Sequence, residues 1–427
     1  MSKLNVLIVG ASVAGPVSAY WFARLGATVT VIERFPSLRS SGQSIDIRTV
    51  GVSVMRKMPG MEAAVRAKTT QLEGMSWVRE NGRPYGIITP TGNPDQQSLV
   101  SEYEIFRGDL AKILFDITKD NENIKYVFGE QVASMQQQHH EHNKEDGPIT
   151  VEFMNGFPTS DYDLVVACDG ATSRTRALGL GCGARDYLDP TNCWASYFTV
   201  ERDLLQGSKI GQAHSAPGGR FMAVGPDPSG ANRVTLMGIS PRNDSKAMSV
   251  HLFREAMKQG DDALKIFVAE HYKGAGWKIG EIVKAMMDST DFYASEIVQV
   301  KLPNLSKGRF VLVGDAGYAP GITGAGTTLA IAGAYVLAGE IGSHKGDLAA
   351  GLQSYEQRMR PIVDDLQKVP SIFPGVLAPQ SVWGIWLRDH IFAFIAWTRI
   401  LEFSQKFFAG AFSNTDKYEF PHYKHMS

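Results

Sequence analysis

The first thirty-three residues constrain the fold more than any other stretch of the chain. Residues 4–9 (LNVLIV) form an apolar run that predicts a buried strand, and a glycine-containing turn at 10–15 follows directly. A helix is expected over 16–25 and a second strand over 28–32, which leads into Glu33. Strand, glycine turn, helix, strand and acid in this order are typical of a unit that binds a dinucleotide.

Each small residue of the turn has a physical role in such a unit. Gly10 permits the tight turn, Ser12 is small enough for a pyrophosphate to approach the backbone, and Gly15 lets the helix pack close to the strand. The N-terminus of the helix offers free N–H groups to phosphate oxygens. Glu33, which Arg34 follows, can accept hydrogen bonds from an adenosine ribose. The stretch therefore predicts a dinucleotide site without identifying the dinucleotide, and an ordinary βαβ turn is the alternative.

Size and composition exclude several classes of protein. A chain of 427 residues is long enough for about two or three domains, and a net charge of -1 gives no reason to expect a nucleic acid or an anionic membrane as partner. The 3 cysteines are too few for a disulfide framework. We expect no transmembrane segment and no leader before the first strand, and therefore a cytoplasmic protein. The histidine-rich tract 136–146 is expected to be a solvated loop, and no metal site is predicted.

A second glycine motif follows another apolar run. Asp169 and Gly170 come directly after residues 162–168, which predict a buried strand. A carboxylate and an open turn would then lie at the carboxyl edge of the sheet, where ligands bind in such folds. Arg174 and Arg176 are expected to add positive charge near the level of the phosphates. The alternative for this motif is a turn whose Ser or Asp caps a helix.

A third motif lies between a predicted strand at 310–313 and a predicted helix of small residues at 326–341. Its aspartate can hold a polyol hydroxyl, and its glycines let the backbone lie against a flat ring. The N-terminus of the helix would stabilise the anionic edge of a reduced flavin. A flexible surface loop is the alternative. The residues of this motif expected at the cofactor are Gly314, Asp315, Pro320, Gly324, Ala325 and Gly326.

In this order and at these separations, the motifs resemble those of the class A flavoprotein monooxygenases, the FAD-dependent aromatic hydroxylases. The resemblance covers residues 4–360, and residues 418–423 resemble the C-terminus of the tetracycline-inactivating branch. Arg107 resembles the family arginine that contacts the ribityl chain and the pyrophosphate. Residues 42–48 resemble the segment that passes the isoalloxazine ring. This chain departs from the family at Tyr318, where many members have histidine.

The resemblance implies a chemistry. It implies tightly but non-covalently bound FAD, NAD(P)H as a transient co-substrate, and O2, with a C4a-hydroperoxyflavin that oxygenates an aromatic or polycyclic small molecule. A flavin-dependent oxidase or dehydrogenase, a Baeyer–Villiger enzyme and a non-catalytic FAD-binding module are the alternatives. Asp46 and Arg48 are the candidates for polar residues near the reacting face, and pairing with each other is the alternative role. The sequence identifies no base for a phenolic substrate.

The expected fold class is α/β (α+β): a Rossmann-like FAD-binding domain interleaved with a mainly antiparallel substrate-binding domain, followed by C-terminal helices. The protein is expected to be a monomer or homodimer. Helices are also expected over 51–66 and 249–259, and packing is the favoured role of the C-terminal aromatic residues. The FAD-binding domain is expected over 1–72, 101–179 and 296–350, the substrate-binding domain over 73–100 and 180–295, and the helical region over 351–427. The residues that could line the substrate pocket, or else belong to the sheet core, are Trp194, Tyr197, Phe221, Met222 and Met237.

Overall fold

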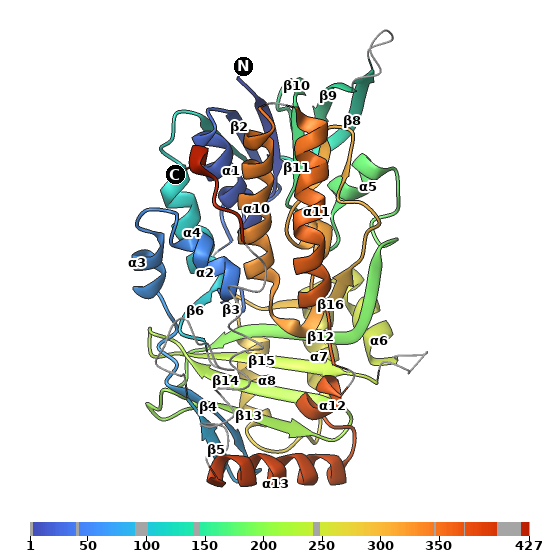
Figure 1. Cartoon of the computed structure of the whole chain (residues 1–427). Coiled ribbons are helices and arrows are strands. Elements are labelled where there is room, and N and C mark those ends of the chain that lie inside the picture. The colour runs from blue at the N-terminus through green and yellow to red at the C-terminus, as the bar shows by residue number, and fades with distance from the viewer. Residues whose placement is uncertain are drawn as a thin grey trace.

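The chain folds around two large sheets, one above the other in Figure 1. The upper sheet is almost entirely parallel and the lower sheet is mainly antiparallel, as the α/β (α+β) fold class predicts. A small antiparallel ladder of two strands, residues 44–46 and 104–106, lies between them. The computed structural model describes residues 3–39, 42–89, 101–139, 146–241, 248–345, 347–370, 372–398 and 420–426.

The upper sheet has six strands in the order β17-β18-β11-β1-β2-β7. Its central strand β1 is buried and pairs in parallel with β2 on one side and β11 on the other. Its strands are β1 (Asn5–Val9), β2 (Thr28–Glu33), β7 (Ile124–Phe128), β11 (Leu164–Ala167), β17 (Ser306–Lys307) and β18 (Phe310–Leu312). Stretches far apart in the sequence thus meet at the carboxyl edge of one sheet, where parallel sheets bind ligands.

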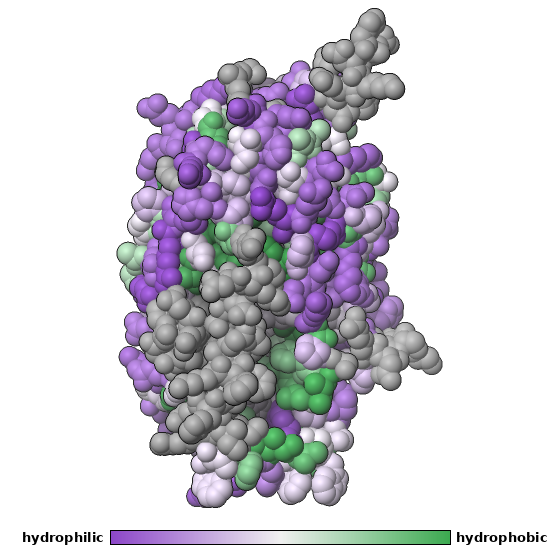
Figure 2. All heavy atoms as spheres, in the orientation of Figure 1, coloured by the Kyte–Doolittle hydropathy of each residue, from purple (hydrophilic) through white to green (hydrophobic). Residues whose placement is uncertain are grey.

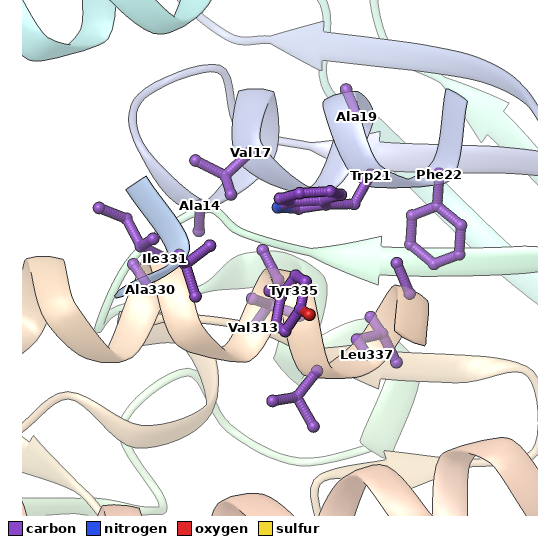
Figure 3. Packing of buried hydrophobic residues seen from close by; sticks show 14 of the residues in the cluster. Ala14, Val17, Ala19, Trp21, Phe22, Val313, Ala330, Ile331, Tyr335 and Leu337 are labelled. Atoms are coloured by element: carbon purple, nitrogen blue, oxygen red, sulfur yellow. The ribbon is translucent and has the colours of Figure 1, made fainter. Parts of the chain in front are cut away.

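Two helices pack face to face on this sheet. α1 (Ala14–Arg24) lies against α10 (Gly326–Ser343), and Figure 3 shows Trp21 of α1 over Tyr335 of α10. The two rings meet edge to face with centroids 5.0 Å apart. α10 is buried on nearly all sides because its residues are small or apolar, and α11 (Leu348–Leu366) covers its other side. This packing holds the N-termini of α1 and α10 at the same edge of the sheet.

The lower sheet has seven strands in the order β16-β12-β15-β14-β13-β4-β5. Its strands are β4 (Gly74–Val78), β5 (Pro84–Ile88), β12 (Leu188–Val200), β13 (Ile210–Ala216), β14 (Arg220–Pro226), β15 (Asn232–Ile239) and β16 (Tyr293–Val300). Three helices cover one of its faces: α6 (Met248–Gln259), α7 (Asp261–His271) and α8 (Ile279–Asp288). The sequence predicted only the first of these helices, whereas the largely antiparallel sheet is as the predicted fold class requires.

Several shorter elements differ from their predictions. The helix expected over 51–66 is two helices, because Pro59 and Gly60 interrupt it and Gly60 adopts a φ of 79°. Residues 136–139 belong to strand β8 and not to a loop, while residues 140–145 lie outside the described residues. The remaining elements are α2 (Thr49–Met55), α3 (Met61–Arg66), β3 (Ser44–Asp46), β6 (Glu104–Phe106), α4 (Arg107–Thr118), β8 (Val132–His139), β9 (Asp146–Phe153), β10 (Ser160–Tyr162), α5 (Arg174–Leu180), α9 (Asp315–Tyr318), the 3-10 turns η1 (Gly321–Thr323) and η3 (Lys424–Met426), α12 (Phe373–Leu377) and α13 (Val382–Thr398).

The C-terminal helices α12 and α13 lie at the lower end of the molecule, where Figure 2 shows apolar residues at the surface. The favoured packing role is correct for Phe392, whose ring lies 5.0 Å from that of Trp77. It is wrong for four other aromatic side chains, and Phe403 lies outside the described residues. The exposed ones are Trp383, Trp386, Phe394 and Trp397. Among the described residues, no helix is both long and apolar enough to cross a membrane.

The last residues of the chain return to the upper half and dock on α10. The phenol of Tyr423 donates a hydrogen bond to Glu340 (2.6 Å), and Arg24 donates one to the carbonyl of Met426 (3.0 Å). Burial, and then the hydrogen bond to Glu340 and its charge, raise the pKa of Tyr423. A Cβ atom on Gly339 would lie only 2.1 Å from the Tyr423 ring. The tail thus depends on a groove that glycine opens in α10.

We expect Gly339→Val to displace this tail and to lower the free energy of unfolding by about 1–3 kcal/mol, the usual cost of overpacking. Denaturant unfolding followed by circular dichroism measures the change. Gly280→Val in α8 is the matched control, because a Cβ there meets nothing within 4 Å. An equal change in the stability of the two variants would contradict the groove, because the exchange would then act only through helix propensity, which favours valine over glycine.

Candidate functional site

The three glycine motifs meet at the carboxyl edge of the upper sheet. Gly10 adopts a φ of +107°, and a Cβ on it would lie 2.7 Å from the carbonyl oxygen of Cys168, directly before the second motif. A Cβ on Gly314 of the third motif would lie 3.0 Å from the Cβ of Ala14 in α1. The first motif therefore touches both of the others, and the backbones approach this closely only because glycine stands at these positions.

The opening turn leaves the N-terminus of α1 open. A Cβ on Gly15 would lie 1.8 Å from the carbonyl oxygen of Gly10, so the turn and the helix approach within backbone contact. No side chain caps α1, and its first turn contains no acidic residue. Next to it, the hydroxyl of Ser12 accepts a hydrogen bond from the Nε of Arg107 (3.2 Å). The arrangement presents N–H groups and one guanidinium to the same space, as a pyrophosphate requires.

Glu33 lies at the end of β2 in the cleft that these residues line. Its carboxylate accepts hydrogen bonds from the backbone N–H groups of Ala11 (2.9 Å) and Phe35 (3.1 Å). The carboxylate therefore holds the turn in place. Each of its oxygens keeps a second lone pair for the predicted contact with a ribose. The guanidinium of Arg34 stacks over the ring of Phe35, 4.7 Å from its centroid, and also lines the cleft.

In the second motif the structure shows both arrangements that the sequence left open: a capped helix and a carboxylate at the cleft. Ser173 caps α5 by accepting from the N–H of Arg176 (2.8 Å). Asp169 accepts from the hydroxyl of Ser173 and from the N–H and hydroxyl of Thr175 (3.1 and 2.9 Å). Asp169 and Gly170 nevertheless line the same cleft as the opening turn. The capping bonds therefore fix the carboxylate at the edge of the cofactor cleft.

The two arginines of this motif have different places. Arg174 lines the cleft, as expected. The expectation for Arg176 is wrong, because its side chain is fully buried and donates to the carbonyls of Ala184 (2.8 Å) and Ala316 (2.8 Å). Burial lowers the pKa of Arg176. This arginine ties α5 to α9, and it is directed into the core because it lies in the buried first turn of the short helix.

The third motif joins α9 to the N-terminus of α10. Asp315 is surrounded by protein but is still accessible to solvent, as in a deep cleft. Burial raises the pKa of Asp315, and the charge of Arg107 opposes this shift. A Cβ on Gly326 would lie 3.3 Å from the Oδ1 of Asp315. Gly324 adopts a φ of +75°, and no side chain caps α10 at Ala325. The carboxylate and the free helix N-terminus therefore face the same space.

Two glutamines that the sequence did not single out hold the loop before α10. Gln299 of β16 donates from its Nε2 to the carbonyls of Pro320 (3.1 Å) and Gln367 (2.6 Å). Gln367, at the end of α11, donates in turn to the carbonyls of Val300 (2.9 Å) and Ala319 (3.0 Å). These bonds fasten the loop to the lower sheet and to α11. Glutamine has no distinctive sequence pattern in such a role, so there was no signal to find it.

Asp46 and Arg48 pair with each other, which is the alternative that the sequence left open. The Nη2 of Arg48 lies 2.9 Å from the Oδ2 of Asp46. The backbone N–H of Arg48 donates to the hydroxyl of Thr328 in the first turn of α10 (3.0 Å), so the pair lies beside the third motif. Glu104, which the sequence did not single out, lies directly across the β3–β6 ladder from Asp46. The structure thus gathers two carboxyl groups and one guanidinium here.

A further cation borders the cofactor cleft. Arg39 lies between two rings, with its guanidinium 5.3 Å from the centroid of Phe35 and 4.6 Å from that of Tyr293. Burial, despite the opposing effect of Tyr293, lowers the pKa of Arg39. With Arg34, Arg107 and Arg174 it gives the cleft four guanidinium groups among the described residues. The sequence indicated only a polar loop at this position. Local patterns could not show that Tyr293 of β16, far away in the sequence, packs against it.

One apolar face of the lower sheet packs against α6, α7 and α8, and its other apolar face points toward the loop before α10. Phe221 and Met237 cluster there with Ile322 of that loop and with Leu377 of α12. Tyr197 lines an adjoining cleft. The pocket role is wrong for the other two candidates, because alternate residues of a strand face opposite sides. These two, Trp194 and Met222, lie in the core beneath α6, α7 and α8.

Comparison with known proteins agrees with this arrangement. A family model described as an FAD binding domain matches residues 3–368. The FAD-dependent monooxygenase asL4 of Sarocladium schorii is 33% identical over 94% of each chain, and monooxygenase CTB7 of Cercospora beticola is 32% identical over 99% of this chain and 98% of its own. Among solved structures, tetracycline destructase Tet(55) is 28% identical, with a TM-score of 0.72 and 99% of each chain covered. Klebsiella pneumoniae HpxO, crystallised with FAD and uric acid, shares the fold (TM-score 0.68, 18% identity, 94% of this chain and 96% of that one).

Proposed function

This chain belongs to the family of FAD-dependent monooxygenases, and we propose that it uses NAD(P)H and O2 to oxygenate an aromatic or polycyclic small molecule. The observation that carries the proposal is the juxtaposition of two surfaces. Asp315, in the segment that leads to α10, interacts with the charge of Arg107 in the cofactor cleft. Ile322 of the same segment clusters with the apolar face formed by Phe221, Met237 and Leu377. A flat apolar molecule held on this face would lie against the ring end of the cofactor.

The residues present fit FAD along the whole length of the cofactor. Glu33 would hold the adenosine ribose, while the open N-terminus of α1 and the guanidinium of Arg107 would hold the pyrophosphate. Asp315 would hold a ribityl hydroxyl, and the uncapped N-terminus of α10 would lie at the ring. Bound FAD supplies the redox chemistry, since it accepts a hydride and activates O2.

The protein itself supplies position and a dry surface. The uncapped N-terminus of α10 would stabilise negative charge on a flavin bound beside it. Phe221, Met237 and Ile322 exclude water from the space beside the ring, which protects a reactive oxygen donor from side reactions. Gln299 and Gln367 hold the loop that carries Ile322 in one geometry. The sequence contains a single turn of the opening type, which FAD would use, and this agrees with the transient docking of NAD(P)H that the family resemblance implies.

A substrate screen tests this proposal. We expect hydroxylated polycyclic aromatic compounds to accelerate NADPH consumption by the purified yellow protein, together with O2 uptake, whereas saturated ring compounds of similar size have no effect. Accelerated consumption in which all of the O2 appears as hydrogen peroxide would instead support an oxidase. A colourless protein that neither binds FAD nor oxidises NADPH would refute the proposal.

A further inference from the structure

Two carboxyl groups face each other next to the proposed ring site. Asp46 of β3 and Glu104 of β6 are directly opposite in an antiparallel ladder, where side chains on one face lie about 5 Å apart. Among the described residues, Arg48 provides the cation in contact with them, through its bond to Asp46 (2.9 Å). Two ionised carboxylates with one guanidinium would leave an unbalanced negative charge in a partly buried place. Such a pair favours holding one proton.

The hydrogen bonds around the pair point to the same conclusion. Among the described residues, the Oδ1 of Asp46 is buried and has no hydrogen-bond partner, although its Oδ2 binds Arg48. Burial, and then the charge of Asp46, raise the pKa of Glu104 to about 7, against the opposing hydrogen bond of Ser44 and the charge of Arg48. A proton on Glu104 is therefore present near neutral pH. It would supply the donor that Asp46 lacks.

Glu104 also lines a cleft between the two halves of the molecule. Gln43 and Ser44 lie on its upper wall, and Tyr197 and Thr235 lie on the wall formed by the lower sheet. The upper wall is held beside the N-terminus of α10 by the backbone of Arg48. Its N–H donates to the hydroxyl of Thr328 (3.0 Å), and that hydroxyl donates to its carbonyl (3.2 Å). A molecule bound between the ring site and the lower sheet is thus within reach of this carboxyl group.

The other charged groups of this cleft are already balanced. Arg233 lines it and lies 2.7 Å from Asp227 and 3.1 Å from Asp291. Its charge is thereby shared between two carboxylates. Glu104, whose pKa is raised to about 7, therefore changes its protonation near neutral pH in this cleft, and Asp46 and Arg48 are its charged neighbours among the described residues.

We propose that Glu104 is the base that accepts a proton from the substrate, and that the substrate is a phenol or an enol. This rests on the proposed monooxygenase function. The O–H bond of the substrate breaks, its electron pair remains on the substrate oxygen, and the proton moves to the Glu104 carboxylate, where Asp46 shares it. The substrate becomes an electron-rich phenolate, which is the form that an electrophilic oxygen donor attacks. The proton returns to solvent when the product leaves.

A binding experiment without turnover tests the assignment. The oxidised, FAD-loaded protein is titrated with 2-naphthol and with 2-methoxynaphthalene, which lacks the proton, between about pH 6 and about pH 8. We expect the Kd of 2-naphthol to fall about tenfold over this range as Glu104 ionises, and the Kd of the ether to stay constant. Glu104→Gln should abolish the pH dependence, whereas Glu104→Asp and the exposed control Glu201→Gln should keep it.

The outcomes separate this inference from the function on which it rests. Equal, pH-independent binding of both probes, no binding of 2-naphthol, or unchanged behaviour of Glu104→Gln would each overturn the inference. The infrared band of a protonated carboxyl group provides a second readout, and we expect it at about pH 6 in the wild type and not in Glu104→Gln. Neither measurement involves oxygenation, so a protein that passes both and consumes no O2 would fail the proposed function alone.

Discussion

Replacing Gly15 with alanine will produce a folded protein that no longer retains FAD. The new Cβ would lie 1.8 Å from the carbonyl oxygen of Gly10, which is backbone and cannot rotate aside. The turn must move by about an ångström or more, and its N–H groups then no longer converge on the pyrophosphate. We expect a weakening of FAD binding by about 100-fold or more, measured by equilibrium dialysis and by the flavin absorbance of the purified protein.

The control for this variant is Gly280→Ala, another helical glycine in a place where a Cβ meets nothing within 4 Å. It should bind FAD as the wild type does. Circular dichroism and gel filtration establish that Gly15→Ala is folded before its affinity is compared. A folded Gly15→Ala protein that binds FAD with wild-type affinity would show that the pyrophosphate lies elsewhere.

The second large effect is expected at Arg107. This residue begins α4, its Nε donates to the hydroxyl of Ser12 (3.2 Å), and its charge opposes the raised pKa of Asp315. Lysine keeps the charge and loses the planar set of donors. We expect Arg107→Lys to weaken FAD binding by about 10- to 100-fold, because charge-assisted hydrogen bonds are worth about 1.5–3 kcal/mol.

Ser12→Ala provides the graded comparison for this site. It removes the one hydroxyl that orients Arg107 and leaves the charge in place, so a loss of about two- to tenfold in FAD affinity is expected. Isothermal titration of the FAD-free proteins measures both variants. The order of affinity should be wild type, Ser12→Ala, Arg107→Lys. An Arg107→Lys protein within twofold of the wild type would remove Arg107 from the cofactor site.

Local patterns were sufficient for the elements that carry the cofactor motifs. The first strand, the glycine turn and the helix follow from apolar runs and from the positions of Gly10 and Gly15, and the structure places them within a residue or two of the prediction. Position in the sequence also predicted that Asp169 would come to the carboxyl edge of the sheet, because it follows a buried strand, and the structure places Gly314 at the same edge. The interior strand pattern therefore determines most of the cofactor cleft.

The missed residues depend on contacts between distant segments. Burial, and then the charge of Asp46 on another strand, raise the pKa of Glu104, and no local pattern indicates that these two strands pair. Arg39 depends in the same way on the ring of Tyr293. For Trp194 the sequence left both the pocket and the sheet core open, and the structure places it in the core. This choice depends on register, since shifting a strand by one residue exchanges its two faces. Periodicity predicts that a strand has two faces but not which of them is covered by helices.

Isotope labelling tests the central claim, that this chain is an FAD-dependent monooxygenase, most directly. The FAD-loaded protein is incubated under 18O2 with NADPH and a compound that accelerates NADPH consumption, and the product is examined by mass spectrometry. We predict one atom of 18O in the product when the gas is labelled and none when only the water is labelled. A product without 18O from the gas, with the label recovered in hydrogen peroxide, would contradict the claim.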